Sequence, residues 1–155
     1  MLGYKYDHIH MKQPDSSYTP RDLTCPPALP QPEYQNDPYP TLVIEIAHRH
    51  ETWGQLLADA RYKAFSQYTT IQIVVGVKIY AKHMKWVWAK RAAVGHGMKI
   101  VRTTPKMRIN QPTTRLFKLP ADLVFWGLPA LPPLPTPYFP LRLETLRQRI
   151  ERYFQ

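Results

Sequence analysis

Two short apolar runs with a helical pattern between them dominate the middle of the chain. Residues 41–47 and 71–80 are rich in β-branched side chains, and most of their consecutive positions are apolar, so that both faces of each segment are apolar. Such runs are typical of strands that lie in the middle of a sheet covered on both faces. Thr52 and Gln55 have capping-box spacing, and apolar residues then recur at helical spacing as far as Tyr68. The order strand, helix, strand predicts a βαβ unit with both strands in one sheet.

Weaker patterns on either side of this unit predict further elements. Residues 84–88 and 98–101 are expected to be strands, joined by a turn around residues 95–97. We also expect a short strand at residues 8–12, a short apolar segment at residues 123–126 and an amphipathic helix at residues 141–155.

The prolines divide the chain into a folded centre and two extended flanks. Of 17 prolines, eight lie between Pro14 and Pro40 and seven between Pro120 and Pro140. Proline is excluded from helix interiors and central strands, and 155 residues make about one domain. We therefore expect one domain at residues 1–128 with a proline-rich loop at about 20–40, a linker at 129–140 and a C-terminal helix at 141–155.

The net charge of +10 is concentrated in one part of the chain. Between Ala60 and Ala121 there is no Asp or Glu, whereas thirteen Lys and Arg occur there. A field of one sign favours a polyanionic partner, of which nucleic acid is the commonest. The alternative is a solvated basic surface with no dedicated partner.

Cysteine usage and hydropathy limit the class of protein. The single cysteine, Cys25, excludes an internal disulfide framework and a cysteine-based zinc site. No apolar run approaches the roughly 20 residues that span a bilayer, and the first residues have no apolar core like that of a signal peptide. We expect an intracellular protein, cytoplasmic or nuclear, with no membrane partner. A homodimer is an open alternative to a monomer.

One carboxylate interrupts the first apolar run. Glu45 stands inside a segment that should be buried, where an unpaired charge is costly. Asp15, directly after Pro14, and Lys63, on the predicted helix, could complete a site. One Asp, one Glu and a backbone carbonyl suffice to hold Mg²⁺ or Mn²⁺, and a lysine can stabilise developing negative charge. The alternatives are a Glu45 that faces solvent on an edge strand or pairs with Lys63 or Arg61, and an ordinary surface ion pair between Asp59 and Lys63.

Several segments together are similar to a known family. Residues 12–20 and 40–47, followed by residues 57–65, 77–79 and 125–129, resemble the restriction-endonuclease-like family of the PD-(D/E)XK nuclease superfamily, in particular its divergent fungal-type members. The resemblance implies an α/β fold whose restriction-endonuclease-like core has a mixed central β-sheet flanked by helices. It also implies a Mg²⁺-dependent endonuclease that cleaves DNA.

Carried over by residue, the resemblance assigns Asp15 and Glu45 as catalytic metal ligands, with the backbone carbonyl of Ile46 as a third. The lysine of the motif is missing, because Ala47 stands two residues after Glu45. We predict that Lys63 supplies it from the following helix, with Lys78 as a second and poorer candidate.

Basic residues of the central segment are candidate phosphate contacts, which give affinity without reading sequence. They are Lys82, Lys85, Lys90, Arg91, Lys99 and Arg102. The chain is thus expected to be a divalent-metal-dependent phosphodiesterase. The alternative is a catalytically inactive nuclease fold that binds nucleic acid or a protein partner.

Overall fold

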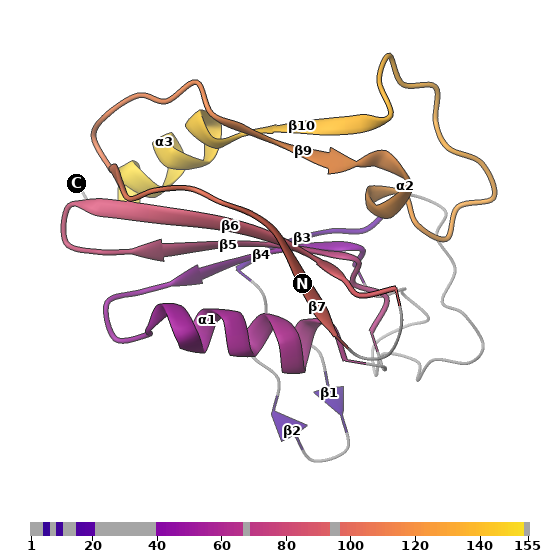
Figure 1. The fold of residues 1–155 in the computed structure, drawn as a ribbon, viewed down its shortest axis with the longest axis horizontal. Coiled ribbons are helices and arrows are strands. Elements are labelled where there is room, and N and C mark those ends of the chain that lie inside the picture. Colours follow the sequence, from indigo (N-terminus) through magenta and orange to yellow (C-terminus); the bar gives the residue numbers. More distant parts are fainter. Residues whose placement is uncertain are drawn as a thin grey trace.

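A mixed β-sheet with helices on both faces forms the centre of the molecule (Figure 1). The computed structural model describes residues 5–6, 9–10, 15–20, 40–66, 69–93 and 97–153. Within these ranges the sheet has six strands in the order β3-β4-β5-β6-β7, and β8 extends the edge by pairing with β6. The strands are β3 (Ser16–Tyr18), β4 (Leu42–Ala47), β5 (Ile73–Ile79), β6 (His83–Arg91), β7 (Met98–Thr103) and β8 (Met107–Arg108).

The central βαβ unit is confirmed. Strands β4 and β5 pair in parallel, and the remaining pairs of this sheet are antiparallel. Helix α1 (Trp53–Asp59) connects them and continues as a short π-helix, η1 (Ala60–Ala64), which ends before the predicted boundary at Tyr68. The capping box is present: Gln55 N donates to Thr52 Oγ1 at 3.0 Å, and Thr52 N donates to Gln55 Oε1 at 2.7 Å.

The opposite face of the sheet is covered by the C-terminal third of the chain (Figure 1). Strands β9 (Leu116–Pro120) and β10 (Tyr138–Arg142) form an antiparallel pair, accompanied by helices α2 (Ala121–Val124) and α3 (Leu143–Tyr153). The apolar segment at residues 123–126 thus begins inside a helix. A further pair, β1 (Lys5–Tyr6) with β2 (Ile9–His10), contains part of the strand expected at residues 8–12.

The expected linker at residues 129–140 is partly wrong. Its last three residues belong to β10, and the helix begins at Leu143 instead of residue 141. Proline is compatible with this strand because β10 pairs with β9 alone, so Pro140 can turn its nitrogen away from the ladder. The expected loop at about residues 20–40 lies outside the described residues except at its ends, as does most of the turn at 95–97.

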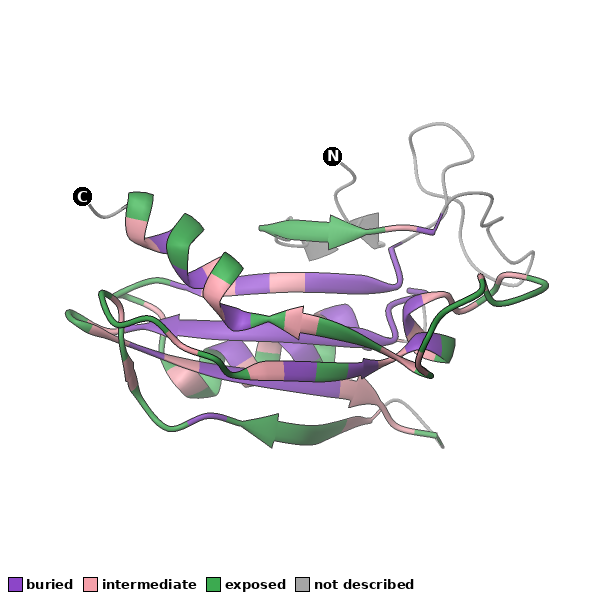
Figure 2. Cartoon of the chain, turned by 90° about the horizontal axis from the view of Figure 1, so that it is seen from above, coloured by how far each residue is buried: buried purple, intermediate pink, exposed green. Residues whose placement is uncertain are grey.

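The hydrophobic core has one cluster on each face of the sheet. On the α3 face, alternate residues of β5 and β6 pack against Phe117, Leu119, Leu143 and Ile150. The smaller cluster on the α1 face includes Val43, Phe65 and Val74. In Figure 2 the central strands are buried, whereas the strands at the two edges of the sheet are mostly exposed. Because α3 contributes to the main cluster, it belongs to the same folded unit as the sheet.

Two further observations concern burial and the length of the helices. The tryptophans of β6 are core residues, since Trp86 and Trp88 are buried in the α3-side cluster. None of the helices in the described ranges is long and apolar enough to cross a bilayer.

Candidate functional site

Asp15 lies beside the middle of β4, close to Glu45. Antiparallel pairing of β3 with β4 sets Ser16 opposite Ile44, so the preceding residue, Asp15, comes next to Glu45. The contact is direct, since the Ile46 backbone N–H donates a hydrogen bond of 2.6 Å to Asp15 Oδ2. The N–H and C=O of one strand residue point toward the same neighbouring strand. The Ile46 carbonyl therefore faces the side on which Asp15 lies, and the three predicted ligands are neighbours.

Glu45 points toward the face that α1 covers. Its alternate neighbour Val43 packs in the α1-side cluster, and side chains two apart on a strand share a face. Only 8% of Glu45 is exposed, so this carboxylate is buried as the sequence pattern predicts. The predicted alternative of a solvent-facing Glu45 on an edge strand is wrong, because β4 lies between β3 and β5.

Gly76 makes room for helix α1 next to Glu45. It is the register partner of Glu45 on β5. A Cβ atom at Gly76 would come within 3.0 Å of Val87 Cγ1 and 3.1 Å of Leu56 Cδ2. The absent side chain therefore lets α1 pack tightly on the sheet at the level of the carboxylate.

A different lysine lies near the position at which the Glu-x-Lys motif would have its lysine. Lys78 of β5 is the register partner of Ala47, and it shares the α1 face with Gly76 and Glu45. It is buried, with 5% exposed, and its Nζ donates to the His48 carbonyl at 2.5 Å. An ammonium group is thus held beside the position where Glu-x-Lys would place one.

Lys63 has the ordinary helical arrangement. Its Nζ lies 2.9 Å from Asp59 Oδ1, and both side chains are more than one-third exposed. This is the i,i+4 surface ion pair that the spacing offered as the alternative. The role of Lys63 in chemistry stays a prediction, and its ammonium is already paired with Asp59.

The donor set at Asp15, Glu45 and Ile46 fits a hard divalent cation. It consists of two carboxylates and a backbone carbonyl, which are the oxygen ligands that Mg²⁺ accepts. No group of three or more His, Cys, Asp and Glu side chains with metal-binding geometry occurs in the described part of the chain. Mg²⁺ does not require one, because it usually retains several water molecules and needs one or two carboxylates.

The predicted phosphate contacts occupy different environments. Lys82 lies exposed in the turn between β5 and β6, whereas Lys85 is held with its Nζ 4.3 Å from the centroid of the Trp53 ring. Lys90 of β6 is the register partner of Lys99 of β7, and Arg102 of β7 is the register partner of Trp88 of β6. These five cations therefore do not form one cluster: Lys82 lies in the turn, Lys85 lies beside Trp53, and the other three lie along β6 and β7.

Arg91 has a structural role that the sequence did not indicate. All five guanidinium N–H groups have partners: Nε donates to Ile71 O, Nη1 to the carbonyls of Phe65 and Ser66, and Nη2 to the carbonyl and hydroxyl of Thr69. Arg91 therefore fastens the segment before β5 to the end of β6. The prediction that it contacts phosphate is corrected on this ground, because it has no donor left to offer.

The sequence signal that distinguishes Lys78 from Lys63 is the alternation of side chains along its strand. Counting by twos along residues 71–80 sets Lys78 on the face opposite to Ile73, Val75 and Val77. What the count cannot supply is the register that brings Lys78 beside Ala47.

Comparisons with known proteins give no relatives. No protein-family model matches the chain, and neither the curated protein sequences nor the solved structures contain a significant match.

Proposed function

We propose that this chain is a divalent-metal-dependent phosphodiesterase with a restriction-endonuclease-like core that cleaves DNA. The observation that carries the proposal is the 2.6 Å hydrogen bond between Ile46 N and Asp15 Oδ2. It holds Asp15 against the residue that follows Glu45, so the two residues that the resemblance assigns as metal ligands are neighbours although they are 30 residues apart in sequence.

Asp15, Glu45 and the Ile46 carbonyl would hold the cation. A divalent cation supplies charge neutralisation at a phosphate and lowers the pKa of a bound water. Glu45 is fixed on a central strand, and the hydrogen bond from the Ile46 amide positions Asp15 while β3 is paired with β4. The small exposed fraction of Glu45 also limits the water around the site, which strengthens its interaction with a cation.

Lys78 would interact with the phosphate or with the attacking water. Support comes from an otherwise unfavourable arrangement, since Lys78 lies directly opposite Lys85 in the β5–β6 ladder. Like charges in directly opposed positions destabilise a sheet. The His48 carbonyl holds one ammonium and the Trp53 ring the other. Two cations held together in this way would be stabilised by a shared anion, which a phosphodiester would provide.

The decisive experiment measures cleavage of plasmid and single-stranded DNA with Mg²⁺ or Mn²⁺. We expect wild-type protein to cleave and EDTA to abolish cleavage. Glu45→Gln should lower the rate at least about 10²-fold, as expected for loss of a group that acts on developing charge. Lys78→Gln should have a similar effect, whereas Lys63→Gln should leave the rate within about twofold of wild type.

A metal-binding measurement, together with circular dichroism, distinguishes loss of the metal site from unfolding of the variant. Mn²⁺ binding followed by calorimetry should disappear in Asp15→Asn and Glu45→Gln while both variants keep the wild-type circular dichroism spectrum. Equal cleavage by wild type and Glu45→Gln would refute the catalytic assignment. If wild type binds DNA with no cleavage and no requirement for metal, the chain is the inactive binding module that the missing Glu-x-Lys lysine favours.

A further inference from the structure

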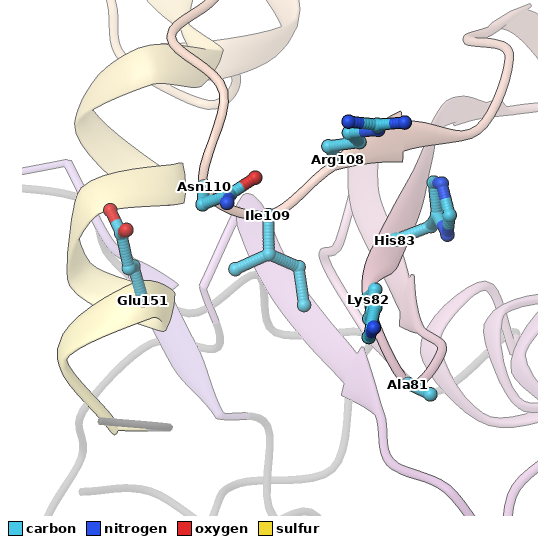
Figure 3. A pocket seen from close by; sticks show the side chains of 7 residues that line it. All are labelled: Ala81, Lys82, His83, Arg108, Ile109, Asn110 and Glu151. Carbon is cyan, nitrogen blue, oxygen red and sulfur yellow. The ribbon is translucent and has the colours of Figure 1, made fainter.

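Three adjoining cavities surround the turn between β5 and β6. The largest has a volume of about 630 Å³ and is lined by Ala81, Lys82, His83, Arg108, Ile109, Asn110 and Glu151. Figure 3 shows that these side chains come from the turn and the start of β6, from the segment at β8 and from helix α3, with Ile109 lying between Glu151 and the residues of the turn.

The other two cavities share residues with the first. A cavity of about 390 Å³ on the α1 side includes Ala81 and extends to Lys78 at the candidate site. A cavity of about 380 Å³ includes His83 and Arg108 and extends to Lys106 and Arg115. Because they share lining residues, the three cavities follow one another along a path from Lys78, past the turn, to the segment at β8.

Positive charge dominates this path. Six Lys and Arg line it against two Glu, and one of the latter, Glu151, is already paired with Arg147 at 2.7 Å. Lys82, Arg108 and Arg115 are exposed, and none of them forms an ion pair with a residue that the structure describes. The path thus offers cations that are available to an anionic ligand. The six are Arg49, Lys78, Lys82, Lys106, Arg108 and Arg115.

Aromatic rings lie among these cations. Trp53 and Tyr80 are half-buried and line the cavity next to Lys78. Lys106 Nζ is 4.2 Å from the centroid of the Tyr80 ring, and Lys85 Nζ is 4.3 Å from that of Trp53. Aromatic faces interleaved with cations are the combination that accommodates unpaired bases together with their phosphates.

We infer that this path, called here the hairpin groove, binds single-stranded DNA and leads it toward Lys78. The second half of the inference rests on the proposed function, while the binding itself does not. A duplex is disfavoured because it is stiff over about 150 base pairs and cannot follow a groove around the end of a two-stranded hairpin. Its bases are also stacked on each other, so they are unavailable to Trp53 and Tyr80.

The inference is tested by fluorescence anisotropy with a labelled single-stranded oligonucleotide of about 16 nucleotides and with the matching duplex, both in EDTA. Lys82→Gln combined with Arg108→Gln should weaken single-strand binding about tenfold and lower the salt slope by about 1.4, or 0.7 for each lost phosphate contact. The matched control is Lys118→Gln with Arg142→Gln, two exposed cations of β9 and β10. The control should bind like wild type.

A second variant tests the rings. Tyr80→Leu should weaken single-strand binding by at least about fivefold, since stacking contributes about 1–3 kcal/mol per base, and should leave the salt slope unchanged. Equal losses in the groove and control variants, or tighter binding of the duplex than of the single strand, would overturn the inference. Because binding is scored in EDTA, its loss is distinguishable from failure of catalysis. The groove would survive an inactive Glu45 site, and cleavage could survive the loss of the groove.

Discussion

Strands β4 and β5 present different side chains to the two faces of the sheet. Toward α3, β5 offers Ile73, Val75, Val77 and Ile79, all of which belong to the main core cluster. Toward α1, β5 is apolar at Val74 but continues through Gly76 to Lys78. Strand β4 repeats the contrast, because its Leu42 packs in the main cluster whereas its Glu45 points to the α1 face. The α3 face therefore holds the larger core cluster, whereas the α1 face combines a smaller cluster with the charged residues Glu45 and Lys78. The two parts can be altered separately.

The largest effect is expected on the α3 face. Phe117→Ala removes a ring that is fully enclosed between β9 and the sheet, and the loss should be about 3–5 kcal/mol in the free energy of unfolding. Urea denaturation measures it. Phe139→Ala on the neighbouring strand β10 is the matched control, since its ring is 41% exposed and its loss should stay within about 1 kcal/mol. Equal costs would mean that burial in the α3-side cluster is not what makes Phe117 important for stability.

A smaller loss is expected from crowding the α1 face. Gly76→Ala places a methyl group 3.0 Å from Val87 Cγ1 and 3.1 Å from Leu56 Cδ2, and both of those side chains are buried. Overpacking of this kind should cost about 1–2 kcal/mol. It should also displace α1 relative to Glu45 and so weaken Mn²⁺ binding. Unchanged stability would mean that the helix can move away from the sheet at little cost.

Acid should loosen the attachment of α3 through Glu144. The hydrogen bond from Arg147, together with that from the Thr113 backbone at 2.8 Å, lowers the pKa of Glu144 from 4.5 to about 2. A carboxylate whose pKa is lowered on folding stabilises the native state above its unfolded pKa. That contribution should therefore be lost as the pH falls from about 4.5 toward 2. Unfolding midpoints measured over this window should decline less steeply in Glu144→Gln than in wild type.

The smallest effect is expected at the partly exposed ion pair between Asp59 and Lys63. Lys63→Gln removes the 2.9 Å contact with Asp59, and such pairs contribute about 0.3–0.5 kcal/mol. Thermal unfolding at low and at high salt measures this loss, which should vanish as salt screens the pair. A loss several times larger would show that Lys63 has a second role at the sheet.

The elements that the sequence predicted are those whose signal is local. The apolar runs of β4 and β5 and the capping box of Thr52 and Gln55 depend on neighbours within a few residues, and all are present in the structure. Strand β10 was missed because its prolines suggested a linker, although pairing with β9 tolerates them. The proline pattern described the residues correctly but could not indicate their partner.

The candidate site follows the same rule. Glu45 could be identified from sequence because its surroundings along the chain are apolar. The nearness of Lys78 to Ala47 could not be predicted in this way, because it depends on the register between two strands. The role of Arg91 likewise depends on residues that are 20 or more positions away in sequence. The carbonyls of Phe65 and Ile71 accept its hydrogen bonds.

The short length of β3 has a consequence for the local stability of the candidate site. This edge strand pairs with β4 through only three residues, all of them exposed, and Asp15 directly precedes it. Short exposed edges open locally at a small fraction of the free energy of global unfolding. Detachment of β3 would withdraw one carboxylate from the other while β4, β5 and both core clusters remain folded. Amide exchange at Ile46, whose proton is held by Asp15, would then report how often the two carboxylates are together. A cation that binds both would slow that exchange without altering exchange in β5.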